Sequence, residues 1–191
     1  RLGIGYYNLV NGKLIRTHRV DVDIDGAETH IPELVGTVRP DLVLLNDGDY
    51  AYAKLRLDER SWQTTLAHLA DVEDSLARAL IWGAAWDSTR DAEADPKDFI
   101  QMVLKNIGTE SNPTAMMTLL NQLVTAATIF LKPENRNEYK TKIGDALLDL
   151  VRKAEAGSES QLQFLKFFPR FANTEEHGKT LRALLTGAEK L

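Results

Sequence analysis

The chain has 191 residues, of which 43% are hydrophobic and 27% are charged, with a formal net charge of −5 and no cysteine. This composition predicts one or two globular domains, and the negative charge disfavours nucleic acid, whose phosphates select clustered basic surfaces. The lack of cysteine excludes disulfides, thiolate metal sites and thiol catalysis. With no signal peptide and no apolar run of about 18 residues, it favours a cytoplasmic protein without a membrane span.

The first 58 residues are expected to be mainly β. Residues 2–10 predict a strand that ends at Asn11-Gly12, a strong hairpin signal because both residues tolerate positive φ. The next run alternates between apolar and acidic side chains, which is typical of a half-buried strand before the turn at Asp25-Gly26. Its two faces hold Val20, Val22 and Ile24, and Asp21, Asp23 and Asp25. We expect further strands at 29–31 and 41–45, and a short extended piece at 50–57.

Such a sheet needs a second layer, and no helix is predicted within the same segment. We therefore interpret residues 1–58 as part of a β-sandwich whose other sheet is missing. Arg1 opens directly onto a strand, which favours a piece of a longer protein. An uncovered apolar face and open edges predict self-association through the β part.

Residues 59–191 follow a helical period and are expected to form a second, α-helical domain. The expected helices are roughly 61–70, 73–91, 96–109, 113–131, 134–156, 159–171 and 174–190. Short loops favour antiparallel hairpins stacked as in HEAT or armadillo proteins, although no repeated signature is present. The predicted fold is therefore mainly α with a small β part: a partial β-sandwich followed by a helical C-terminal domain.

Helix boundaries carry local signals. The N-cap candidates are Asp95 and Asn112, each before a proline, Ser158 with Gln161, and Asn173 with Glu176. We expect helix stops at Gly108 and Gly157, because glycine adopts the left-handed conformation of a C-cap.

Two aromatic groups are interpreted as core. The stripe Leu76, Leu80, Gly83 and Trp86 has helical spacing, as does the group Phe164, Phe167, Phe168 and Phe171. For the phenylalanines, a partly exposed interface is the minor alternative. The acidic residues beside the first stripe are expected to face solvent for the most part, with a buried pair between Arg90 and Asp87 or Asp91.

No catalytic motif is found. A zinc-peptidase helix needs H-E-x-x-H, and no histidine in this chain is followed by glutamate. The histidines are His18, His30, His68 and His177. No serine lies in G-x-S-x-G, and the glycine-rich stretches lack the spacing of phosphate loops.

One acidic stretch resembles a calcium loop. Asp21, Asp23, Asp25 and Gly26 match the start of an EF-hand, but the twelfth position is Pro32 instead of glutamate and the flanks are strands. We interpret it as a solvated strand face. The sequence therefore predicts no catalytic residue, no cofactor-binding residue and no metal-binding residue in this chain.

Residues 42–93 carry a family resemblance. This stretch begins LVLLNDGDYAYAKLRLDERS and ends DSLARALIWGAAWDSTRDAE. It closely resembles the C-terminal half of M1-family zinc aminopeptidases, the aminopeptidase N group, and most of all the actinobacterial type. There, a similar LLND…YAK segment precedes a helix of the RA-xxWGxxWD kind. In that family the segment marks the junction between a small β-sandwich domain and a large helical C-terminal domain.

The resemblance implies a zinc-dependent parent enzyme that removes N-terminal residues from peptides. It implies that residues 59–191 cap the substrate chamber against the parent's catalytic domain. The family's zinc ligands lie in H-E-x-x-H plus a downstream glutamate, and a G-x-M-E-N motif holds the substrate's amino group. Neither motif is present, so this chain alone is predicted to hold no zinc and to be inactive. The alternative is a stand-alone α-solenoid that binds protein partners.

Overall fold

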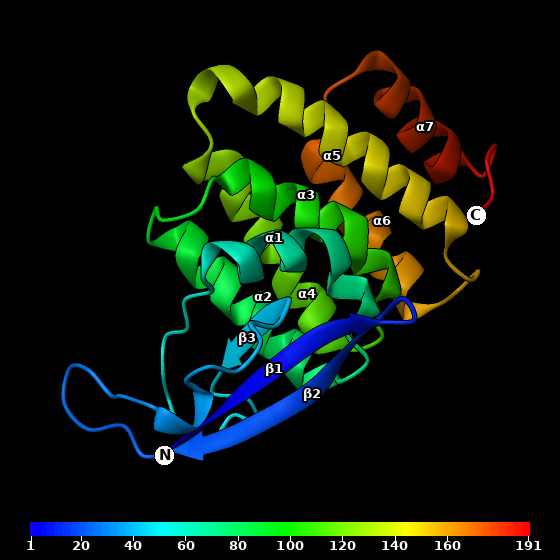
Figure 1. The fold of residues 1–191 in the computed structure, drawn as a ribbon. Helices are drawn as coiled ribbons and strands as arrows, with labels where there is room; N and C mark the ends of the chain where they lie inside the picture. The colour runs from blue at the N-terminus through cyan, green and yellow to red at the C-terminus, as the bar shows by residue number, and fades with distance from the viewer. The chain divides into compact units, whose positions relative to one another are not determined.

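A computed structural model describes residues 1–191 and divides them into two compact units, Arg1–Ala94 and Asp95–Leu191. The protein is mainly helical with one small antiparallel sheet, which confirms the predicted fold class (Figure 1). Each helix is too short or too polar to cross a membrane. The domain division between residues 58 and 59 stays a prediction: helix α1 begins at Glu59, whereas the compact units divide after Ala94.

The first unit contains the sheet. Its strands are β1 (Leu2–Val10), β2 (Lys13–Val22) and β3 (Leu42–Leu45), in the order β2-β1-β3. The hairpin at Asn11-Gly12 is confirmed, since both residues have positive φ. The expected strand at 29–31 is wrong. Thr29 Oγ1 instead accepts from the Asp25 N–H at 3.2 Å, which closes a local turn. Residues 50–57 pair with no strand.

A helix packs against one edge strand of the sheet. Helix α1 (Glu59–His68) packs against β3, and the Val43 N–H donates to Ser61 Oγ at 2.9 Å. The turn Leu69–Asp71 follows, and Val72 after it pairs with Leu14 of β2. Both Leu42 and Leu44 are fully buried. Because α1 lies just beyond residue 58, the expectation of a further sheet that completes a sandwich stays a prediction. Self-association was predicted partly from an uncovered apolar face, and the packing of α1 against β3 weakens that part of the argument.

Helix α2 (Ser75–Arg90) buries a different stripe from the one predicted. Leu76 is 43% exposed and Gly83 is exposed, whereas Ala77, Ile81 and Trp82 are buried. The buried side of α2 differs from the predicted one for a simple reason. Residues 76–86 are almost all apolar, so periodicity alone cannot select which side of this helix is buried.

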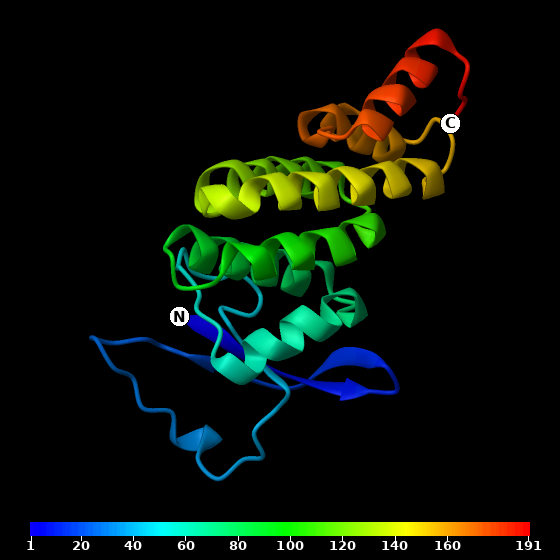
Figure 2. The same ribbon diagram turned by 90° about the horizontal axis from the view of Figure 1, so that it is seen from above.

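The second unit consists of five helices. They are α3 (Pro96–Asn106), α4 (Pro113–Thr125), α5 (Pro133–Lys153), α6 (Glu159–Phe171) and α7 (Glu175–Thr186). Helix α4 continues as a π-helical turn over Ala126–Phe130. Helix α3 packs against α4 and α5, and α6 also packs against α4 and α5 (Figure 2).

Most predicted caps in this unit are confirmed. Asp95, Asn112 and Ser158 each accept backbone N–H donors at the start of a helix. Helix α7 corrects the prediction by one residue, because its N-cap is Thr174. The Asn173 side chain instead accepts from Thr141 Oγ1 at 3.1 Å.

The predicted glycine stops are wrong in detail. Gly108 lies inside the 3₁₀ turn Ile107–Thr109 without positive φ. Gly157 has φ of 76°, but α5 ends earlier, at Lys153.

The phenylalanine group forms core, as predicted. Phe164, Phe167, Phe168 and Phe171 are at most 6% exposed. The Phe168 ring meets His177 of α7 edge-on, with ring centroids 5.3 Å apart. A Cβ on Gly144 would lie 2.6 Å from His177 Cε1, so glycine at this position of α5 makes room for the imidazole.

Candidate functional site

The loop after β3 is fixed by its own side chains. Asn46, Gly48 and Asp49 all have positive φ, which short polar residues and glycine tolerate best. The Asn46 amide donates to Ala51 O at 2.7 Å and accepts from Ala51 N at 3.0 Å. This is the LLND segment of the family-like block, and its sequence thus specifies a closed turn.

The turn places Asp47 in a buried polar network. Asp47 is 1% exposed and accepts from Tyr7 Oη at 2.9 Å and from Arg16 Nη1 at 2.9 Å. Burial raises the pKa of the Tyr7 phenol, and the hydrogen bond to Asp47 and its charge act in the same direction. The hydrogen bond to Asp47 likewise raises the pKa of Arg16.

Two glycines of β1 make room for Asp47, Gly3 for its backbone oxygen and Gly5 for its carboxylate. A Cβ on Gly3 would lie 2.3 Å from Asp47 O, and a Cβ on Gly5 would lie 2.6 Å from Asp47 Oδ2. The Asp47 N–H also donates to Gly3 O at 3.0 Å. The G-x-G of β1 therefore allows the close approach of Asp47.

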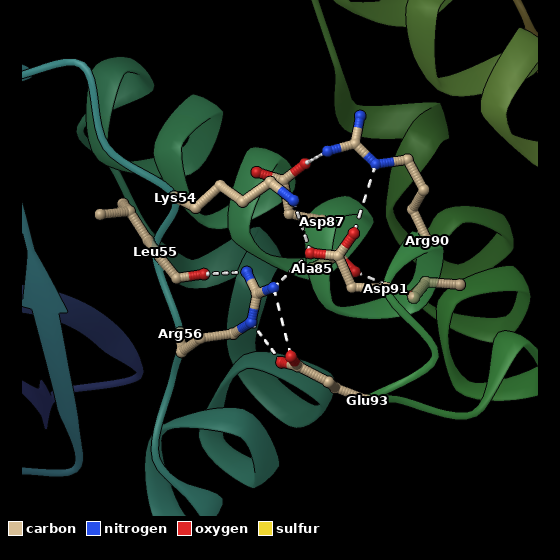
Figure 3. Close-up of polar contacts among 9 residues, drawn as sticks. Lys54, Leu55, Arg56, Ala85, Asp87, Arg90, Asp91 and Glu93 are labelled. Carbon is tan, nitrogen blue, oxygen red and sulfur yellow. Dashed lines mark hydrogen bonds and ion pairs between the residues drawn. The ribbon is translucent and has the colours of Figure 1, made fainter.

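A second network joins the YAK segment to the end of α2 (Figure 3). Lys54 Nζ lies 2.6 Å from Asp91 Oδ2, and Arg56 pairs with both Asp91 and Glu93. Leu55 between the two cations is 6% exposed, so the cations and the buried leucine alternate along the segment. The hydrogen bond from Lys54 is the main cause that lowers the pKa of Asp91.

Arg90 extends this network along α2. Its Nη2 lies 2.8 Å from Asp87 Oδ1, and its Nε lies 3.7 Å from Asp91 Oδ1. The sequence predicted a buried pair of Arg90 with Asp87 or Asp91, and Arg90 contacts both carboxylates. The Arg90 side chain is 46% exposed, so neither pair is a buried one. We name the group Lys54, Arg56, Asp87, Arg90, Asp91 and Glu93 the α2 clamp.

Neither network is predicted as a unit by the sequence. Asp91 and Glu93 were expected to lie on the solvated side of α2, and no partner was predicted for Asp47. One signal was available: the cations of Lys54-Leu55-Arg56 and the carboxylates of Asp91-Ala92-Glu93 have the same i, i+2 spacing. Asp91 is the C-cap of α2 and Ala92 has φ of 62°, so these carboxylates belong to a turn at the helix end and not to a strand.

The histidines do not form a site for a zinc ion. His68 Nδ1 lies 2.9 Å from Asp71 Oδ2. His177 Nε2 contacts Asp145 Oδ1 at 2.8 Å, while its Nδ1 accepts from the Asn173 N–H. The rings of His18 and Tyr6 meet edge to face. No three His, Asp or Glu side chains lie close enough together to hold a metal ion. The donor set of this chain therefore does not fit zinc.

The arrangement supports structural roles better than chemical ones. The carboxylates of both networks are engaged by Arg, Lys or Tyr donors. In the second unit, the buried His177 is held at both ring nitrogens, by the Asn173 N–H and by Asp145.

The chain is similar to a known domain family and to a named protein. Residues 42–189 match the model of the ERAP1-like C-terminal domain. The whole chain is 43% identical, over 192 residues, to a protein named Aminopeptidase N from Streptomyces lividans. The aligned region covers 22% of that relative, so the chain spans about a fifth of its length.

Proposed function

Because the chain belongs to the ERAP1-like C-terminal domain family, we propose that it is the non-catalytic C-terminal part of a zinc-dependent aminopeptidase. The parent enzyme removes N-terminal residues from peptides and carries its zinc ligands in another region. The observation that supports this proposal most is the 43% identity to an Aminopeptidase N across all of this chain. The alternative of a stand-alone solenoid has no comparable support.

Within this proposal, residues 1–58 belong to a β-sandwich domain and residues 59–191 to the helical domain. The helical domain caps the substrate chamber, its partner is the catalytic domain of the same parent chain, and the enzyme works in the cytoplasm. The two networks support a scaffold role. The α2 clamp ties residues 54–56 to the end of α2, and Asp47 ties the LLND turn to β1 and β2.

The proposal is tested by restoring the upstream region of the gene. We would assay three polypeptides with aminoacyl chromogenic substrates and added zinc: the parent, the parent without this region, and this chain. We expect the parent to be active and this chain to be inactive, because it supplies no zinc ligands. Zinc-dependent activity of this chain alone would refute the proposal. So would a parent that binds no zinc.

A further inference from the structure

Strand β2 forms an open edge of the sheet. The strand order β2-β1-β3 places β1 on one side of β2 (Figure 1), and the other side has a single bridge, from Leu14 to Val72. From Ile15 to Val22, every residue is exposed or half-buried. Such an edge presents unpaired backbone N–H and C=O groups, so it can pair with a strand of another chain.

The charges of this edge change sign at Val20. The cationic side chains come before it and the carboxylates after it: Lys13, Arg16 and Arg19, then Asp21, Asp23 and Asp25. An antiparallel pair of two such strands places the positive half of one against the negative half of the other. A parallel pair in register would place like charges side by side, which is destabilising. The edge therefore complements a second copy of itself in the antiparallel direction.

One register satisfies this pattern best. When Val20 lies opposite Val20 of a second copy, Arg19 lies opposite Asp21. A slip of two residues is the smallest that keeps each side chain on its own face of the sheet. Such a slip centres the pair on Arg19 or on Asp21 and puts two like charges directly opposite each other, which destabilises the pair. The charges therefore select the register centred on Val20.

The two charged side chains at this point of β2 are already held in place. Arg19 Nε and Nη2 donate to Asp21 Oδ1 of the same chain at 3.0 and 2.9 Å, and the Arg19 guanidinium lies over the Tyr50 ring at 5.0 Å. The side chains of Arg19 and Asp21 remain 24% and 42% exposed, so a second pair of opposite order can reach them. Because they are already ordered, little side-chain freedom is lost on association.

We propose that β2 pairs with β2 of a second copy of this chain, antiparallel and centred on Val20, so that two three-stranded sheets join edge to edge. Arg19 and Asp21 then form two ion pairs between the copies. The bridge between Leu14 and Val72 is kept, because it lies outside this overlap. The interface is small, so we expect a weak dimer with a dissociation constant of about 10–100 μM.

This proposal gives the predicted self-association through the β part a defined strand and register. It does not depend on the peptidase assignment, because it concerns this chain alone.

The test is sedimentation equilibrium of the full chain at concentrations from about 5 to 500 μM, a range that brackets the expected dissociation constant. We expect the average mass to rise from that of one chain toward that of two, and to rise less in concentrated salt, which screens the ion pairs. Amide exchange within residues 18–22 should slow as concentration increases, because pairing occupies outward N–H groups. A chain that stays monomeric, or a dimer without this protection, would overturn the proposal.

Complementary variants test the register. Asp21→Lys places cations opposite Arg19, and Arg19→Glu places anions opposite Asp21, so each variant alone should associate at least about tenfold more weakly. In a mixture of the two, Arg19 faces Asp21 and the introduced lysine faces the introduced glutamate. The mixture should therefore form a heterodimer. A mixture of two folded variants that stays monomeric would refute the proposed register.

A matched variant controls for net charge. Asp149→Lys makes the same change of charge at an exposed side chain of α5, outside β2. It should change the dissociation constant less than about twofold. Equal weakening by Asp21→Lys and Asp149→Lys would contradict pairing through β2, even if Arg19→Glu fails to fold.

Discussion

At the scale of single residues, the contact between Tyr7 and Asp47 links a strand to a turn forty residues away. Both side chains are buried, so neither can exchange its partner for water without opening the structure. Arg16 holds the other carboxylate oxygen but is 39% exposed. Loss of the Tyr7 hydroxyl should therefore cost more than loss of Arg16, because water cannot replace it. Its removal leaves Asp47 with a single side-chain donor.

We predict that Tyr7→Phe lowers the free energy of unfolding by about 1.5–3 kcal/mol, the usual range when a buried hydrogen bond to a charged group is lost. The matched control is Tyr6→Phe on the same strand, where the ring is half-buried; we expect a change within about 0.5 kcal/mol. Urea unfolding of both variants measures the difference. Equal losses in the two variants would show that the Asp47 contact contributes nothing specific.

At the scale of elements, the α2 clamp connects an irregular segment to the end of a helix. Its side chains are partly exposed, from 24% for Asp87 to 54% for Lys54, so its contribution to global stability should be modest. Its local effect should be larger. The residues after α2 have no regular structure, and Arg56 holds both Asp91 and Glu93 there.

We predict that Arg56→Ala lowers the free energy of unfolding by about 1 kcal/mol or less and speeds amide exchange at residues 91–94. Lys153→Ala, which removes an exposed pair between neighbouring turns of α5, should leave exchange at residues 91–94 unchanged. Hydrogen exchange with mass spectrometry reads both variants. Unaltered exchange at residues 91–94 in Arg56→Ala would contradict a local stabilising role for the α2 clamp. In concentrated salt, which screens the ion pairs, the difference in exchange between wild type and Arg56→Ala should shrink.

Elements differ in how far the sequence can specify them. The helix starts at Asp95, Asn112 and Ser158 were predictable because a cap joins atoms only a few residues apart. The buried side of α2 was not, since its apolar residues surround the helix. The strand at 29–31 failed because a side-chain turn at Asp25 competes with strand pairing.

At the scale of the whole molecule, the features that could not be predicted from the sequence depend on contacts between residues far apart in the chain. The fold class followed from periodicity, yet the layer that covers β3 came from α1 across the expected domain boundary. The absence of a zinc motif could be read directly from four histidines. The partner of Asp47 could not, because Tyr7 and Arg16 meet it only once β1, β2 and the turn are assembled.

Four carboxylates in different parts of the chain, Asp41, Asp58, Asp91 and Glu138, have a lowered pKa, and three of them illustrate how the molecule responds to acid. The Leu9 N–H and Arg60 lower the pKa of Asp41, Lys54 and Arg56 lower that of Asp91, and Lys142 lowers that of Glu138. A carboxylate whose folded pKa is lowered contributes stability above its unfolded pKa, and this contribution is lost as pH falls through the folded value. The ordinary values are 3.8 for aspartate and 4.5 for glutamate.

We therefore predict that the urea midpoint is nearly constant from neutral pH to the upper end of this range, and falls steadily as the pH drops below 4.5 and then 3.8. The Lys54→Ala variant removes the largest cause of the lowered pKa of Asp91, so it should lose less stability over the same acid interval. Urea titrations of both proteins at a series of pH values test this. A wild-type midpoint that stays constant into the acid range, or a steeper loss in Lys54→Ala, would contradict the assignment of these carboxylates as stabilising partners.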